Sequence, residues 1–212
     1  MHRKRLFREL RWLPIASAFT VLTAVVVHLA LRPSPRAADA EQYAVLSAYI
    51  EPGLTGDSHD LGSREGLVVI AANTTFSAPL INSNRFKQYT SRIVSTRHAK
   101  TTIHELSRSL LFEFWVTNLR DVTLKPRFQL PVPYELANQN EMKLYGYEEF
   151  HRRFPNNYGV LTFSRVAFNS ELTEAFFYTE HLCGLCGEGK FVYMRKMAGK
   201  WVVADTAGTW IS

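Results

Sequence analysis

The chain has 212 residues, 46% of them hydrophobic and 21% charged, a composition typical of a globular protein and not of a disordered one. Its net charge of +6 is concentrated in residues 1–40, which carry seven basic and two acidic residues, so residues 41–212 carry a net charge of only +1. The sequence therefore excludes the broad basic surface with which a folded domain binds nucleic acid, and we expect no nucleic-acid partner.

The N-terminal segment predicts a membrane anchor. Residues 12–31 contain no Asp, Glu, Lys or Arg, and this length of helix reaches ~30 Å, the thickness of the hydrocarbon core of a bilayer. Five basic residues precede the segment, and cationic residues stay on the cytoplasmic side of a membrane. We therefore predict a basic cytoplasmic tip over residues 1–11 and a single transmembrane span over residues 12–31. This span would lie in the inner membrane, with the rest of the chain outside the cytoplasm.

A cleaved signal peptide is the alternative. The small residues of Ala38-Asp39-Ala40 have the spacing of a cleavage site, and cleavage there would release a secreted protein that begins at Glu41. The apolar run is longer than in most signal peptides, and two prolines and two arginines separate it from Ala40, which favours the anchor. In both cases residues 32–40 form a stiff linker and residues 41–212 form one exported domain.

Helices are predicted mainly in the first part of this domain. Tyr43, Leu46 and Ile50 occupy one stripe of a helix. Thr102 and Glu105 have the spacing of a capping box, in which each side chain pairs with the backbone of the other residue at a helix start. The sequence therefore predicts helices over residues 41–50, 102–118 and 147–154.

Strands are predicted mainly in the last third. Residues 67–70 are an aliphatic run typical of a buried strand. Apolar and polar residues alternate over residues 128–136, where Pro131 and Pro133 place the strand at a sheet edge because proline cannot donate a ladder hydrogen bond. Four further strand-like runs with short links predict an antiparallel meander: 160–168, 174–182, 190–197 and 200–210. The expected fold class is α+β, with helices packed on one face of a mainly antiparallel sheet.

Both cysteines of the chain lie in a turn between two of these strands, next to His181. A disulfide between Cys183 and Cys186, or a pair of inert thiols, is the first interpretation, and an oxidising compartment favours the bond. A thiol–disulfide or thiol-dependent enzyme that uses the same pair is the second. A metal site of His181, Cys183 and Cys186 is the third, although it supplies three ligands where structural zinc takes four. Because this CxxC spacing lies outside a βαβ unit, we favour the structural bond and expect no cofactor.

No complete catalytic set is visible in the sequence. The Gly-x-Ser-x-Gly, His-Glu-x-x-His and calcium-loop patterns do not occur. The leading hypothesis is a non-catalytic domain that binds a protein or a small molecule, with Arg165, Glu180 and His181 as candidate binding residues. Arg165 could bind an anion, and Glu180 and His181 could tune the adjacent cysteines. Aromatic residues of the meander are expected to supply the core and any apolar pocket on the concave face of the sheet: Phe176, Phe177, Tyr178, Phe191, Tyr193 and Trp201.

The C-terminal motifs carry a resemblance. Phe163-Ser164-Arg165-Val166-Ala167-Phe168-Asn169, Cys183-Gly184-Leu185-Cys186-Gly187-Glu188-Gly189, Gly199-Lys200-Trp201 and Trp210-Ile211-Ser212 resemble a group of uncharacterised bacterial exported proteins. The resemblance is distinctive over residues 159–212 and implies an envelope protein, with no activity attached. Members of the group often have one more residue between the two cysteines, so spacing rules for metal sites or thioredoxins are not carried over. The overall layout also resembles that of cystatin-like and NTF2-like domains, an analogy of fold alone.

Overall fold

The computed structural model describes residues 35–55, 66–74, 95–146, 148–182 and 187–211. The predicted anchor over residues 12–31 lies outside these ranges, as do Cys183 and Cys186. Within these ranges no helix has the length and apolar character that a membrane span requires.

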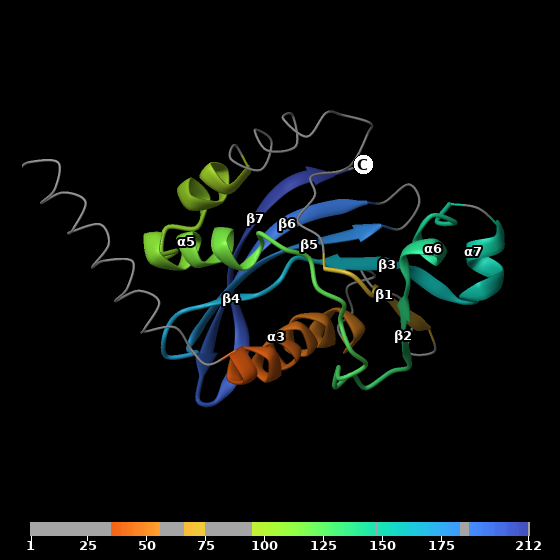
Figure 1. The fold of residues 1–212 in the computed structure, drawn as a ribbon, viewed down its shortest axis with the longest axis horizontal. Coiled ribbons are helices and arrows are strands. Elements are labelled where there is room, and N and C mark those ends of the chain that lie inside the picture. Colours follow the sequence, from red (N-terminus) through yellow and green to blue (C-terminus); the bar gives the residue numbers. More distant parts are fainter. Residues whose placement is uncertain (1–34, 56–65, 75–94, 147, 183–186, 212) are drawn as a thin grey trace, which may run out of the picture.

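One mixed sheet of seven strands organises the domain (Figure 1). Its strands are β1 (Leu67–Ala71), β2 (Tyr134–Ala137), β3 (Asn157–Phe163), β4 (Ala167–Phe168), β5 (Glu174–Leu182), β6 (Glu188–Met197) and β7 (Lys200–Ile211). The order across the sheet is β2-β1-β3-β5-β6-β7, and β4 also pairs with β5. β1 is parallel to β2 and β3, whereas all other pairs are antiparallel. The predicted α+β class and the antiparallel meander of β5, β6 and β7 are confirmed.

Helices cover both faces of the sheet, so the prediction that they pack on one face is wrong. The helices are α3 (Pro35–Thr55), α5 (Arg108–Thr117), α6 (Gln139–Met142) and α7 (Glu148–Arg153), and residues 95–102 are also helical. Neighbouring residues of a strand point to opposite faces of its sheet. On β5, Phe176 packs on Phe114 of α5 at 5.0 Å between ring centroids, and Phe177 packs on Tyr49 of α3 at 5.4 Å. A central strand that is apolar on both faces needs cover on both.

The predicted capping box at Thr102 is also wrong. Thr102 ends the helical residues 95–102, and α5 begins only after Ser107, whose hydroxyl oxygen accepts a hydrogen bond from the backbone N–H of Leu110 at 3.1 Å. Glu105 instead forms an ion pair of 2.8 Å with Arg195 of β6. Ser107 is itself a favourable N-cap residue, so a second cap signal five residues later in the sequence determines where α5 starts.

Two predicted strands are shorter than expected. The 128–136 segment contributes only β2, which begins after Pro133, and the prediction that this strand lies at an edge of the sheet is confirmed. The 160–168 segment is divided into β3 and β4 by residues 164–166. This interruption places Arg165 outside the regular ladder.

The aromatic residues of the meander are all buried, as predicted for core residues. They do not share one pocket, because they divide between the two faces of the sheet. Four of them pack with α5, namely Phe176, Tyr178, Phe191 and Tyr193, and two pack with α3, namely Phe177 and Trp201.

Candidate functional site

A β-bulge between β3 and β4 is the starting point of the candidate site. Phe163 lies opposite Thr179, and Ala167 lies opposite Phe176. Between these two paired positions lie three residues on the β3–β4 side, 164–166, but only two residues on β5. One extra residue on one of two paired strands is a β-bulge. Ser164 closes the gap, since its backbone N–H donates to the Tyr178 carbonyl at 2.8 Å and its hydroxyl oxygen accepts from the Tyr178 N–H at 2.8 Å. Bulges redirect side chains, and here the redirected residue is Arg165.

Side chains from two helices satisfy the backbone groups that the bulge removes from the ladder. Asn118, the C-cap residue of α5, accepts from the Arg165 N–H at 2.8 Å and donates through Nδ2 to the Arg165 carbonyl at 3.1 Å. The Gln42 side chain on α3 accepts from the Val166 N–H at 3.3 Å. Buried backbone groups need such partners. The bulge is therefore hydrogen-bonded to side chains of both α3 and the C-cap of α5.

A cavity of about 370 Å³ lies beside this bulge. It is bounded by the N-terminal part of α3, the C-terminal half of α5, the loop around residues 122–125 and the bulge itself. Its lining residues are Ala38, Asp39, Gln42, Tyr43, Glu113, Thr117, Val122, Thr123, Lys125, Arg165, Val166 and Phe168. This volume lies within the range of about 300–1,000 Å³ in which proteins bind small molecules. Four of the lining residues carry charge, so the cavity suits a polar ligand.

Arg165 is half-buried in the wall of this cavity. Its Nη1 donates to the Thr117 carbonyl at the end of α5 at 2.9 Å, where the helix dipole favours a cation. Burial lowers the pKa of Arg165, and the negative charge of Asp39 partly opposes that shift. An arginine retains its charge under these conditions, because its ordinary pKa lies far above neutral pH. The cavity therefore contains a cation that has lost part of its hydration.

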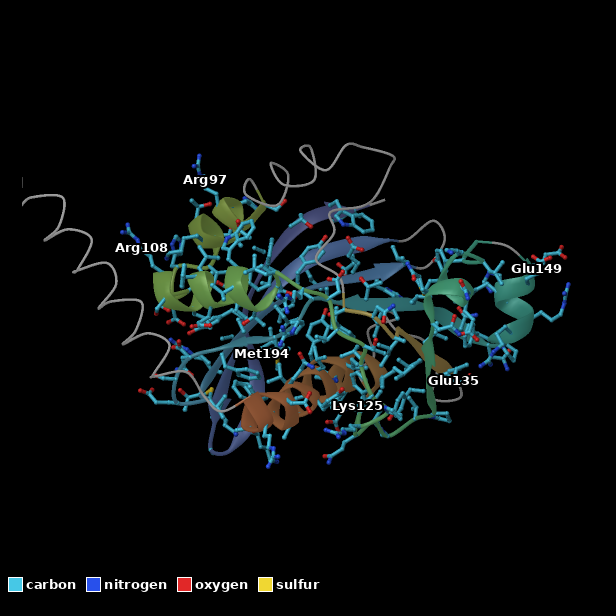
Figure 2. All side chains as sticks on the ribbon, in the orientation of Figure 1. Arg97, Arg108, Lys125, Glu135, Glu149 and Met194 are labelled. Carbon is cyan, nitrogen blue, oxygen red and sulfur yellow. The ribbon has the colours of Figure 1, made fainter. Side chains whose placement is uncertain are left out.

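Asp39 and Lys125 complete the charged lining near Arg165. Asp39 forms an ion pair of 2.9 Å with Arg127, so its charge is already compensated. The backbone N–H of Lys125 donates to the Tyr43 hydroxyl at 2.8 Å, which ties the loop to α3, and Figure 2 shows Lys125 beside that helix. With Glu113 of α5, these residues give the lining two basic and two acidic side chains.

Glu180 belongs to a different, buried site on the sheet. It is 7% exposed and lies opposite Thr162 of β3 and Gly189 of β6. The Tyr178 hydroxyl donates to Glu180 Oε1 at 3.0 Å and accepts from Trp210 Nε1 at 3.0 Å. Burial raises the pKa of Glu180, and its hydrogen bonds oppose this shift only in part. Burial also raises the pKa of Tyr178 far above its ordinary value. The side chains of Tyr178, Glu180 and Trp210 are therefore hydrogen-bonded to one another, and none of the three lines the cavity.

His181 lies on the opposite face of β5 from Glu180, since it is the next residue along the strand. It is half-buried and is paired across the sheet with Leu161 and Glu188. The structure therefore does not bring Arg165, Glu180 and His181 together. Among the described residues no group of three or more His, Cys, Asp or Glu side chains could hold a metal ion. The disulfide, redox and metal interpretations of Cys183 and Cys186 stay predictions, because both residues lie outside the described ranges.

Sequence reasoning singled out Arg165 but missed the residues that build its cavity. Asn118 and Gln42 carried no motif, because each pairs with a backbone group that is distant in the sequence. The one available signal was the asparagine at the expected end of a helix, where this residue is a frequent cap.

No family model, curated protein or solved structure matches this chain. The resemblance to a group of bacterial exported proteins therefore rests on the C-terminal motifs.

Proposed function

We propose that the domain that begins with α3 (Pro35–Thr55) binds a small molecule, and that the ligand occupies the cavity beside the β-bulge. The observation that carries this proposal is the cavity of about 370 Å³ around the half-buried Arg165. The bulge, the C-terminal half of α5 and the first turns of α3 all contribute to this cavity. Concave sites with a few fixed polar groups are where proteins generally bind small molecules.

The arrangement supports binding more than catalysis. A general acid or base needs a pKa near the working pH and a partner that receives its proton. Arg165, whose guanidinium belongs to this wall, remains a cation and therefore does not act as a general acid or base. The polar groups of this wall can orient a ligand by charge and hydrogen bonds.

For location, we propose that residues 12–31 anchor the chain in the inner membrane with the domain outside the cytoplasm. The uncharged run and the preceding basic residues support this topology. Protease added to intact spheroplasts should remove the domain and leave a short N-terminal fragment in the membrane fraction. A domain that is protected until the membrane is opened would refute the topology, and a domain released without protease would favour cleavage near Ala40.

A matched pair of substitutions on α3 tests the binding function. Ala38 lines the cavity, and Ala40, on the same helix, is exposed and does not. The Ala38→Phe variant should fill the cavity, whereas Ala40→Phe adds the same ring to the surface. Thermal unfolding of the full chain in mild detergent would be followed against a library of several hundred polar metabolites.

Ligands of the cavity should raise the melting temperature of the wild type and of Ala40→Phe but not of Ala38→Phe. The proposal fails if every stabilising compound also stabilises Ala38→Phe. It fails as well if no compound stabilises the wild type.

A further inference from the structure

The outward face of α5 carries exposed apolar side chains, although this helix already buries Leu110 and Phe114 on its other face. Phe112 is 53% exposed, and Leu119 is 74% exposed. Leu119 lies in the turn that continues α5, since its N–H donates to the Val116 carbonyl at 3.4 Å. Phe112 and Leu119 are seven residues apart, or two helical turns, and so share one face. A helix on the surface of a globular domain carries polar residues on its outward face, so this exposure indicates a further contact.

Three cations accompany this apolar face. Arg108 begins α5, while Arg97 and Lys100 belong to the helical residues 95–102, which share a hydrophobic cluster with α5 through Ala99. Figure 2 shows Arg97 and Arg108 pointing away from the sheet on the same side of the molecule. Within the described part of the chain, no ion pair involves any of the three cations.

The acidic side chains of this region do not neutralise the three cations. Glu105 forms an ion pair of 2.8 Å with Arg195 of β6. Glu113 lies on the side of α5 that lines the cavity. Arg120 is followed by Asp121, so these two residues add no net charge. The outward face of α5 therefore combines positive charge with exposed apolar side chains, the combination with which proteins bind anionic lipid surfaces.

The path of the chain brings this face close to the membrane of the proposed anchor. α3 begins at Pro35, four residues after Leu31, and an extended chain of that length reaches at most about 14 Å. Ala38 near the start of α3 and Thr117 at the end of α5 line the same cavity, so the two helix ends lie close together. An anchored chain would therefore keep α5 near the lipid headgroups.

We propose that the outward face of α5 docks on an anionic lipid membrane. Phe112 and Leu119 would lie at the level of the headgroups, and the three cations would contact lipid phosphates. An acidic protein would match the same charges, but the anchor places a membrane beside this face. The docking goes beyond the binding function of the cavity and rests on the proposed anchor.

A pair of tryptophan reporters tests the contact. Leu119→Trp places an indole in the proposed interface, and Leu144→Trp places one at an exposed position between α6 and α7, at the other end of the sheet (Figure 1). Both full-length variants and the wild type would be reconstituted into vesicles of phosphatidylcholine with about 30% phosphatidylglycerol, in which the phosphatidylcholine is either plain or brominated near the headgroup. Bromine quenches an indole that it contacts. After subtraction of the wild-type signal, bromination should lower the emission of Leu119→Trp at least about twofold and that of Leu144→Trp by less than about 1.2-fold.

Charge substitutions assign the docking to the cations. Arg97→Gln combined with Arg108→Gln, in the Leu119→Trp protein, should remove at least about half of the quenching, and so should vesicles without phosphatidylglycerol. Lys143→Gln combined with Arg152→Gln removes two exposed cations at the far end of the sheet and should leave the quenching unchanged.

The outcomes separate the docking from the other proposals. Equal quenching of the two reporters overturns the docking, as does quenching that persists after the arginine substitutions or without phosphatidylglycerol. A blue-shifted emission of Leu119→Trp without quenching would show that protein covers this face, and it also overturns the docking. Flotation with the vesicles measures the anchor separately, and a chain that does not float refutes both the topology and the docking. The binding function of the cavity depends only on the comparison of Ala38→Phe with Ala40→Phe.

Discussion

Replacing Asn118 by alanine should destabilise the domain, because this one side chain connects α5 to the bulge. Its amide makes three hydrogen bonds: to the Phe114 carbonyl at 2.9 Å, to the Arg165 carbonyl at 3.1 Å and from the Arg165 N–H at 2.8 Å. Each such bond contributes a net ~0.5–1.5 kcal/mol, so their loss amounts to about 1.5–4.5 kcal/mol. Water from the adjacent cavity can reach the freed backbone groups, which favours the lower half of this range.

The loss should be measured by urea unfolding of the full chain in mild detergent, followed by tryptophan fluorescence. The backbone of Asn118 has φ −94° and ψ 18°, which alanine adopts without strain, so the effect reports the lost bonds. Asn140→Ala, in the exposed part of α6, is the matched control and should change stability by less than about 0.5 kcal/mol. If Asn118→Ala lowers the free energy of unfolding by no more than this control, the bulge is not held by the C-cap and the construction of the cavity is refuted.

Three further changes test other parts of the structure. Because the pKa of Glu180 is raised by burial, its neutral form favours folding below the ordinary glutamate pKa, and this contribution is lost as the pH rises through the folded-state pKa. The free energy of unfolding of Glu180→Gln relative to wild type should therefore increase from pH 4 to pH 8, and a flat difference would contradict the burial argument. Gly189→Ala would place a methyl group 2.6 Å from Trp210 Cδ1 and should cost at least ~1–3 kcal/mol in urea unfolding, so a neutral result would exclude this packing. Glu41→Ala removes the acceptor of the buried Trp201 Nε1 and should cost about 1–3 kcal/mol, whereas an unchanged unfolding midpoint would show that water replaces the carboxylate.

Sequence patterns correctly predicted the helices and strands whose hydrophobic periodicity is visible within a few neighbouring residues. The stripe of Tyr43, Leu46 and Ile50 lies within α3, and the predicted strand over residues 174–182 coincides with β5. Both elements carry a hydrophobic pattern strong enough to be read in a short window. The start of α5 was missed because two cap signals, Thr102 and Ser107, compete within a few residues and tertiary packing decides between them.

The site could be predicted only in part, for a different reason. Arg165 was visible as a charged residue within a strand, but the extra residue that redirects it appears only in the register with β5. The partners Asn118 and Gln42 are 47 and 124 residues away in sequence from the groups that they bind. Contacts of such long range leave no periodic signal, so neither the cavity nor its separation from Glu180 could be inferred.

Because the cavity lies at the start of α3, an anchored chain would keep it close to the membrane. Ala38 is seven residues beyond Leu31, the end of the proposed anchor, and a fully extended chain of that length reaches at most about 25 Å. An anchored domain would thus hold the opening within a few nanometres of the lipid headgroups. The domain would therefore meet its ligand in the thin aqueous layer next to the membrane rather than in bulk solution.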